Sequence, residues 1–150
     1  DISPDRIILE GSSSREKYLE TYNKIDIALS PFPYGGVTTT AEGLWMGVPI
    51  IVMRGDRYIS HVGESIVENV GLSEWVANDI NDYVNKAVEF SSQIDKLSDI
   101  RESLRDKVLS SPLFDAKRFA ISFEKTLLNI WKEYKKLNNK NLSNYLKNII

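Results

Sequence analysis

A pair of glycines followed by three threonines is the part of this sequence best suited to bind an anion. Gly35 and Gly36 precede Thr38, Thr39 and Thr40, and the residues that follow have a helical pattern. Glycines let the backbone approach a ligand closely, and the first amides of a helix lie unpaired at the positive end of its dipole. The threonine hydroxyls add donors there. The segment therefore predicts a diphosphate site at Gly36, Thr38, Thr39 and Thr40.

Glu42 stands one turn into the same predicted helix, and two roles are open to it. In the first, which periodicity alone favours, Thr39 is the N-cap of a capping box and Glu42 reaches back to its amide. In the second, Glu42 accepts hydrogen bonds from two ribose hydroxyls while the nearby amides hold phosphates. The two roles can alternate with ligand occupancy. Neither the dinucleotide fingerprint nor the P-loop spacing of glycines is present.

Alternating strands and helices must position these residues. Apolar runs predict strands at residues 6–10, 25–29 and 49–53 and a short one at 75–76. Helical spacing and turn signals predict helices at residues 15–24, 38–46, 60–69, 79–91 and 93–109. This order predicts an α/β fold with a parallel, Rossmann-like sheet and flanking helices. Three or four strands are few for a complete domain of this kind, and the chain starts without Met. We therefore expect the first β-α units to lie upstream of this sequence.

The last third of the chain has a different pattern. Apolar side chains spaced by three or four residues predict one long helix beginning near Asp115; they are Phe119, Phe123, Leu127, Ile130 and Tyr134. This stripe either covers the chain's own sheet or crosses to a neighbouring domain. We expect residues 1–136 to form one partial lobe that includes this helix. Residues 137–150, rich in Asn and Lys, form either a marginal helix or a disordered tail.

Composition narrows the class of protein. Nineteen basic and 21 acidic residues leave a net charge of −2, so no long-range field favours nucleic acid or an anionic membrane as a partner. The absence of cysteine and the presence of one histidine make a zinc site improbable, so we expect neither a metal nor another cofactor. No apolar run is long enough to span a bilayer. We expect a cytoplasmic protein.

A few further residues invite functional roles, and simpler ones are favoured. Arg54 and Arg57 follow a predicted strand and are more simply solvated loop charges than phosphate ligands. His61 is the one imidazole, yet a single histidine in such a segment is usually structural, so no catalytic residue is assigned. The tryptophans at positions 45, 75 and 131 are interpreted as packing residues rather than sugar platforms.

The segment at residues 26–50, DIALSPFPYGGVTTTAEGLWMGVPI, resembles the catalytic region of the O-linked N-acetylglucosamine transferase family. Gly55-Asp56-Arg57 and the later Ser111-Pro-Leu-Phe-Asp115 add to the likeness, which runs from about residue 6 to 134. It is as close to bacterial, tetratricopeptide-linked members and plant Spindly-type relatives as to animal enzymes. The resemblance implies two Rossmann-like lobes of the GT-B type, with this chain in the C-terminal lobe that binds a UDP-sugar donor.

The resemblance also implies roles for single residues. Thr38 and Thr39 match a Thr-Thr pair at the donor diphosphate, and Glu42 matches an acidic residue at the ribose. Val37 departs from the animal pattern, which has histidine there, so the polar contact near the phosphates that this histidine would make is not expected here.

Four residues upstream match positions close to the base. Arg15 and Tyr18 lie near positions where animal enzymes have a lysine and a histidine beside the nucleotide. Arg15 keeps the charge, whereas Tyr18 keeps a ring that could stack. Ser13 and Ser14 would offer backbone groups to the uracil.

These residues favour an enzyme lobe that binds a UDP-N-acetylglucosamine-like donor. The full protein would transfer the sugar to Ser or Thr hydroxyls of a protein acceptor. An N-terminal lobe, with tetratricopeptide repeats, would complete it, so this chain alone would be inactive. Two alternatives stay open: a non-catalytic protein-interaction module of the same fold, and a lobe of a UDP-sugar epimerase. Since Spindly-type relatives use a GDP-sugar, the base is open too.

Overall fold

The chain folds into two separate units. The computed structural model describes residues 2–147, and the chain divides after Ser111, with a second unit that begins at Pro112. Among the residues that the structure describes, none of the helices is both long and apolar enough to cross a membrane.

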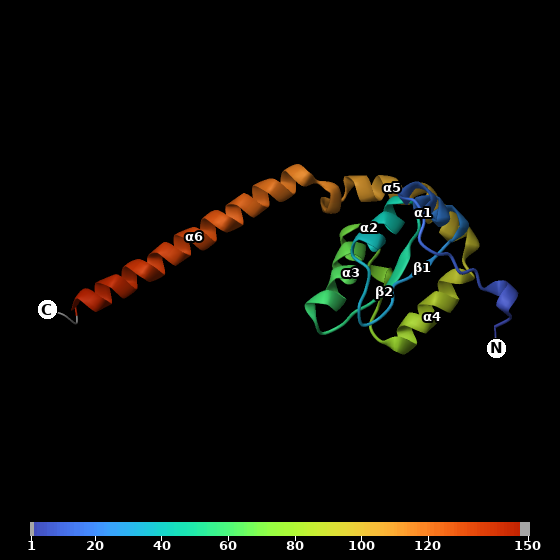
Figure 1. Cartoon of the computed structure of the whole chain (residues 1–150), viewed down its shortest axis with the longest axis horizontal. Coiled ribbons are helices and arrows are strands. Elements are labelled where there is room, and N and C mark those ends of the chain that lie inside the picture. Colours follow the sequence, from blue (N-terminus) through green and yellow to red (C-terminus); the bar gives the residue numbers. More distant parts are fainter. Residues whose placement is uncertain (1, 148–150) are drawn as a thin grey trace. The chain divides into compact units, whose positions relative to one another are not determined.

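A three-stranded parallel sheet lies at the centre of the first unit (Figure 1). Its strands are β1 (Ala28–Leu29), β2 (Ile50–Met53) and β3 (Val76–Ala77), hydrogen-bonded in the order β1-β2-β3. In the register, Ala28 lies opposite Ile50, and Val52 lies opposite Val76. Crossover helices α2 (Thr38–Trp45) and α3 (Tyr58–Asn69) join consecutive strands, as parallel pairing requires. The predicted alternation is confirmed.

Helices cover both faces of the sheet. Helices α2 and α3 lie on one face and α4 (Ile80–Ser91) on the other, while α5 (Ile94–Ser110) contacts both α2 and α4. Before the sheet, the chain forms the 3-10 turn η1 (Pro4–Arg6), then α1 (Arg15–Thr21), which continues into the 3-10 turn η2 (Tyr22–Lys24). A third 3-10 turn, η3 (Ser73–Trp75), leads into β3.

Local signals in the sequence explain where several helices begin and end. The Ser14 side chain caps α1 and the Asp79 side chain caps α4, each by accepting from an amide three residues later. Just past α2, Gly47 has a φ of 81°, a left-handed conformation that glycine adopts without strain. The Arg105 guanidinium on α5 donates to the Trp45 carbonyl at 2.9 Å and so satisfies an acceptor in the last turn of α2.

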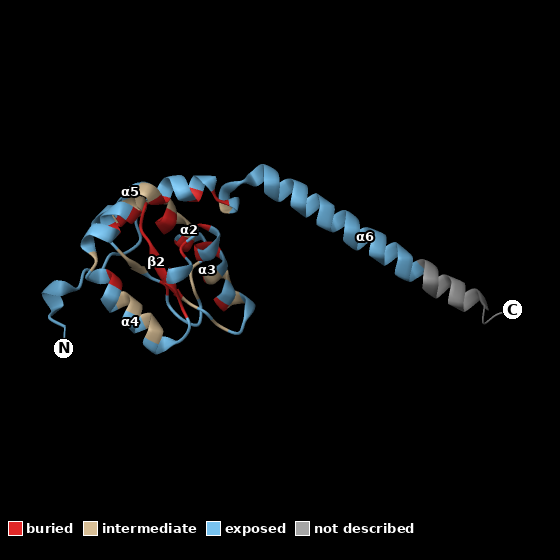
Figure 2. Ribbon diagram, turned by 180° about the vertical axis from the view of Figure 1, so that it is seen from behind, coloured by how far each residue is buried: buried red, intermediate tan, exposed pale blue. Residues whose placement is uncertain are grey.

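The hydrophobic core surrounds β2. Figure 2 shows buried residues concentrated on β2 and on the helix faces turned toward it. Ile51 is fully buried, and Trp75 packs against Phe90 with their ring centroids 4.4 Å apart. Helix α5 contributes a buried stripe made of Leu97, Ile100, Leu104 and Val108. The packing role predicted for Trp75 is thus confirmed.

The strand predicted at residues 6–10 does not form. Residues 7–10 have no regular secondary structure, and Ile8 and Leu9 are 82% and 91% exposed. A strand requires a hydrogen-bonded neighbour, and within the described residues no strand of the sheet pairs with this segment. Its apolar side chains were therefore a misleading signal, because a strand depends on a partner as well as on composition.

The second unit is largely one helix. The 3-10 turn η4 (Pro112–Phe114) precedes α6 (Ala116–Lys147), which begins next to the predicted start. Its apolar stripe forms as predicted, and the side chains of Phe119, Phe123 and Ile130 are more than half exposed. The helix continues through the first part of the predicted tail; residues 148–150 lie outside the described residues.

A pair of identical substitutions on α5 tests the core. Leu104 is fully buried, so Leu104→Ala should lower the free energy of unfolding by about 2–5 kcal/mol through lost burial and a cavity. Leu109, on the same helix and 53% exposed, is the matched control. Leu109→Ala should change the free energy of unfolding by less than about 0.5 kcal/mol. Urea denaturation followed by circular dichroism measures both; equal losses would contradict this placement of α5.

Candidate functional site

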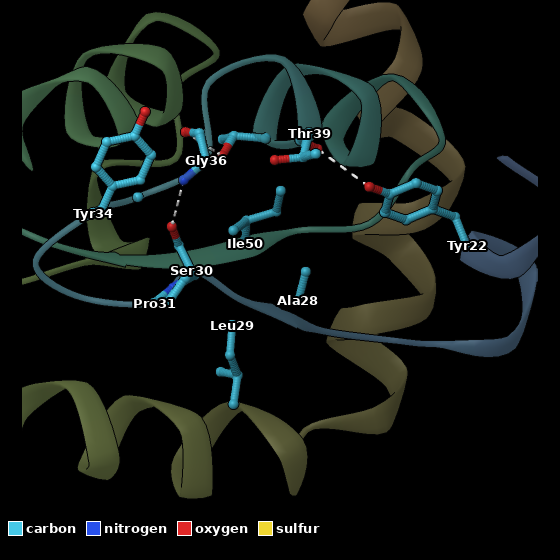
Figure 3. Close-up of a pocket in the computed structure, with 11 residues that line it drawn as sticks. Tyr22, Ala28, Leu29, Ser30, Pro31, Tyr34, Gly36, Thr39 and Ile50 are labelled. Carbon is cyan, nitrogen blue, oxygen red and sulfur yellow. Dashed lines mark hydrogen bonds between the residues drawn. The ribbon is translucent and has the colours of Figure 1, made fainter. Parts of the chain in front are cut away.

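A cavity of about 340 Å³ opens beside the loop that joins β1 to α2 (Figure 3). Its walls come from β1, from the loop at residues 30–36 and from the first turn of α2, with Tyr22 at one side. The loop leaves the carboxyl end of β1, which is the side of an open α/β sheet where ligands bind. The predicted residues Gly36, Thr39 and Thr40 all line this cavity.

Gly36 is held at the entrance to α2 through both of its backbone polar groups. Its N–H donates to Ser30 Oγ at 3.3 Å, and its carbonyl accepts from Thr40 Oγ1 at 2.8 Å. A Cβ at this position would collide with the Thr39 hydroxyl and lie 3.0 Å from the Thr40 hydroxyl. A larger residue at position 36 would therefore require the Thr39 side chain to move.

The three threonines differ in how their side chains are placed. Thr38 and Thr39 are exposed at the start of α2. Thr40 is 2% exposed, and its hydroxyl donates a hydrogen bond to the Gly36 carbonyl. By the geometry of a helix, the amides of these three residues have no acceptor within α2. They are therefore donors available at the positive end of the helix.

The predicted capping box is absent, and that interpretation was wrong. The N-cap of α2 is Val37, whose carbonyl accepts from the Ala41 amide at 3.1 Å, and no side chain caps the helix. Because α2 starts earlier than the capping box requires, Thr39 already lies inside the first turn. Glu42 therefore does not reach back to the Thr39 amide, and its carboxylate turns elsewhere.

Glu42 pairs instead with Arg15, the first residue of α1. Arg15 Nη1 lies 2.8 Å from Glu42 Oε1, although the two residues are far apart in the sequence. The Glu42 side chain is 14% exposed and that of Arg15 is 72% exposed. Ser14, the N-cap of α1, and Ser13 directly precede this arginine and are both exposed. The structure thus brings the predicted ribose residue together with the predicted base-proximal segment.

A chain of tyrosine hydroxyls also connects α1 to α2. Tyr18 and Tyr22 oxygens lie 2.7 Å apart, and Tyr22 donates to the Thr39 carbonyl at 3.3 Å. Because a carbonyl can only accept, Tyr22 gives its proton to Thr39, and Tyr18 gives its own to Tyr22. Burial, together with this hydrogen bond, raises the pKa of Tyr18. Sequence reasoning missed Tyr22, although its spacing of four residues from Tyr18 places both on one helix face.

The loop is held from the opposite face of the sheet as well. Tyr83 on α4 donates from its hydroxyl to the Ser30 carbonyl at 2.9 Å, and burial raises the pKa of this phenol. Ser30 therefore uses its carbonyl toward α4 and its hydroxyl toward Gly36. No sequence pattern indicated this contact, because the two residues are joined only by the tertiary fold.

Past the carboxyl end of β2, charged side chains pair with α3. Arg54 Nε lies 2.7 Å from Glu64 Oε1, and His61 Nδ1 lies 2.9 Å from Glu64 Oε2. Burial acts to raise the pKa of Glu64, but hydrogen bonds from His61 and Arg54 outweigh it and hold that pKa below its usual value. This cluster ties β2 to α3. Among the described residues, no three acidic or histidine side chains are grouped so that they could hold a metal ion.

The chain matches one protein family and is similar to several named proteins. Residues 1–123 match the family described as glycosyl transferase family 41. The chain is 40% identical over 117 residues to a protein of Arabidopsis thaliana named probable UDP-N-acetylglucosamine–peptide N-acetylglucosaminyltransferase SPINDLY, covering 78% of this chain and 13% of that protein. It is 29% identical over 133 residues to the UDP-N-acetylglucosamine–peptide N-acetylglucosaminyltransferase of Caenorhabditis elegans, covering 89% of this chain and 12% of that protein.

A solved structure is also similar. An O-GlcNAc transferase mutant of Thermobaculum terrenum superposes with a TM-score of 0.75 at 32% identity, over 81% of this chain and 23% of that one. The predicted fold class, a Rossmann-like lobe of the GT-B type, is confirmed by this match and by the parallel sheet. The chain thus spans only a small part of the relatives that it matches.

The contact between Tyr83 and Ser30 makes stability depend on pH at the alkaline end. Because folding raises the pKa of Tyr83 above its ordinary value of 10.0, its contribution is complete below that pH and is lost as the pH rises toward the folded pKa. Tyr83→Phe should cost about 1 kcal/mol at neutral pH through the lost hydrogen bond. It should also reduce the alkaline decline without abolishing it, since Tyr18 is shifted in the same direction.

Urea denaturation at a series of pH values from neutral to strongly alkaline measures both effects. Tyr58→Phe, at an 85% exposed side chain, is the control and should leave stability at neutral pH within about 0.5 kcal/mol of the wild type. An alkaline decline of the same steepness in Tyr83→Phe and the wild type would contradict the assignment.

Proposed function

Because the chain belongs to glycosyl transferase family 41, we propose that it forms part of the lobe that binds the nucleotide-sugar donor in a glycosyltransferase. The full protein would transfer N-acetylglucosamine from a UDP-linked donor to Ser or Thr hydroxyls of a protein acceptor. The names of the Arabidopsis and Caenorhabditis relatives both contain UDP-N-acetylglucosamine. These names support uracil as the base of the donor and N-acetylglucosamine as the transferred sugar.

One observation carries the proposal. A recessed carboxylate, Glu42, lies one turn from the unpaired amides that open α2, and helix α1 brings a guanidinium to that carboxylate. A nucleoside diphosphate has the matching groups in the same order: an anionic diphosphate, a ribose with two vicinal hydroxyls, and a base. We assign the diphosphate to the helix start and the ribose to Glu42.

At the diphosphate, both backbone amides and side-chain hydroxyls would donate hydrogen bonds. The amides of Thr38, Thr39 and Thr40 donate to phosphate oxygens, and the exposed hydroxyls of Thr38 and Thr39 add two donors. Thr40 acts through Gly36, whose carbonyl it holds, and so keeps the loop clear of the phosphates. Val37, where animal relatives have a histidine, contributes no polar side chain.

At the base, the segment that starts α1 would form the wall of the site. Ser13 and Ser14 offer backbone groups to the uracil edge, and Tyr18 lies within one turn of Arg15. The hydroxyl chain from Tyr18 through Tyr22 to Thr39 fixes the distance between this wall and the diphosphate end. Base and phosphates would then be positioned as one unit.

In the transfer reaction, this lobe would act by positioning the donor and by stabilising the leaving group. As the glycosidic bond breaks, negative charge grows on the UDP diphosphate, and fixed amide dipoles at a helix start stabilise such charge without reorganisation. We propose that no metal ion is needed for this step. An N-terminal lobe would supply the acceptor groove and any general base, so the chain alone would bind the donor without turnover. Tetratricopeptide repeats and a cytoplasmic location belong to the same proposal.

Calorimetric titration with UDP and GDP tests the donor site. Wild type should bind UDP in preference to GDP, and Glu42→Ala should weaken UDP binding by about tenfold to a hundredfold, the loss expected for hydrogen bonds to a charged acceptor. Glu42 caps no helix, and its ion pair with the exposed Arg15 is worth about 0.2–1 kcal/mol, so the same variant should lower the free energy of unfolding by no more than about 1 kcal/mol.

Glu20→Ala removes an exposed carboxylate from α1 and is the matched control, with UDP affinity expected to match the wild type. Circular dichroism confirms that each protein is folded. If folded wild type fails to bind UDP, or if Glu42→Ala binds UDP as tightly as the wild type, the donor-site proposal is wrong and Glu42 serves only its ion pair with Arg15.

A further inference from the structure

An ion pair occupies the carboxylate that we assign to the ribose. Arg15 Nη1 lies 2.8 Å from Glu42 Oε1, which is hydrogen-bonding distance between a full cation and a full anion. Two vicinal ribose hydroxyls can donate to the two oxygens of one carboxylate, and each oxygen can accept more than one hydrogen bond. The guanidinium therefore does not exhaust the acceptors of Glu42, but it occupies the approach to Oε1 before any nucleotide arrives.

The two partners differ in how freely they can move. Glu42 is a recessed side chain, 14% exposed, in the middle of α2, whose packing against β2 and α5 fixes its backbone. Arg15 is 72% exposed at the first position of α1 and is reached from solvent on most sides. When the pair opens, the long guanidinium side chain is the partner that leaves, while the carboxylate stays in place.

We propose that Arg15 competes with the ribose for Glu42, so that the ion pair sets how strongly the site discriminates between a ribose and a sugar that lacks its hydroxyls. This proposal rests on the donor site described above. In the free protein, Arg15 covers the carboxylate; on binding, ribose hydroxyls replace it at Glu42. The free energy needed to open the ion pair therefore reduces the net affinity that the ribose hydroxyls contribute.

The size of the effect follows from the exposure of the pair. Ion pairs with one largely exposed partner are weak, about 0.2–1 kcal/mol in most measurements, because water and salt screen them and the long side chain loses freedom. Arg15 should therefore reduce the discrimination in favour of ribose by about twofold to fivefold at most. Such a pair keeps the recessed carboxylate compensated in the free protein and still opens readily to the donor.

Two ligands isolate this competition from every other role of Arg15. Affinities for UDP and for 2′,3′-dideoxy-UDP are measured by calorimetry on wild type and on Arg15→Gln. Any attraction between the guanidinium and the diphosphate acts on both ligands alike, so it cancels in the ratio of the two affinities. We expect Arg15→Gln to raise the preference for UDP by about twofold to fivefold, whatever it does to each affinity separately.

Lys17→Gln is the matched control, because it removes the same charge from an exposed position on the same helix. Its preference ratio should equal that of the wild type. High salt provides an independent check in the unmodified protein, since screening of the pair should move the wild-type ratio toward that of Arg15→Gln.

The outcomes separate the two proposals. If wild type prefers UDP and Arg15→Gln leaves that preference unchanged, the competition is wrong and the donor site stands. A preference that falls in Arg15→Gln also overturns the competition, because Arg15 would then support the ribose contact. If folded wild type binds both ligands equally, Glu42 does not read the ribose, and the donor-site proposal fails together with the competition.

Discussion

The tight turn at Gly36 places the start of α2 beside the cavity. Gly36 donates to Ser30 and accepts from Thr40, so the turn between β1 and α2 is held on both sides by its own residues. A side chain here would overlap the Thr39 hydroxyl. Because the turn is this tight, α2 begins directly beside the carboxyl end of β1, and Thr39 and Thr40 in its first turn line the cavity. Everything that the site could do with an anion depends on that closeness.

Two further hydrogen bonds connect this turn and the start of α2 to neighbouring helices. Tyr83 connects Ser30 to α4 on the opposite face of the sheet, and Tyr22 connects the first turn of α2 to α1. The loop is thus supported by helices on both faces. Rigid support of this kind keeps donors at fixed positions, which is what electrostatic stabilisation of a leaving group requires.

The ion pair between Arg15 and Glu42 gives a recessed carboxylate a cationic partner on another helix. A carboxylate that is mostly shielded from water needs a partner, and the largely exposed Arg15 supplies one. The pair formed by Arg54 and Glu64 is of the other kind, since it joins β2 to α3 and has a further contact from His61. In our proposal the first pair serves binding, whereas the second joins two elements of the fold.

The sequence by itself predicted the order of the helices and of the three strands that form, the helix start next to the glycine pair, and the residues that we assign to the diphosphate. These depend on local periodicity, on turn residues and on spacing within one segment. The capping box was mistaken because helix starts shift by a residue or two with tertiary contacts, and the strand at residues 6–10 was mistaken because a strand needs a neighbour. Only the tertiary structure decided that Arg15 meets Glu42 and that Tyr83 holds Ser30, because contacts between distant segments have no local signature in the chain.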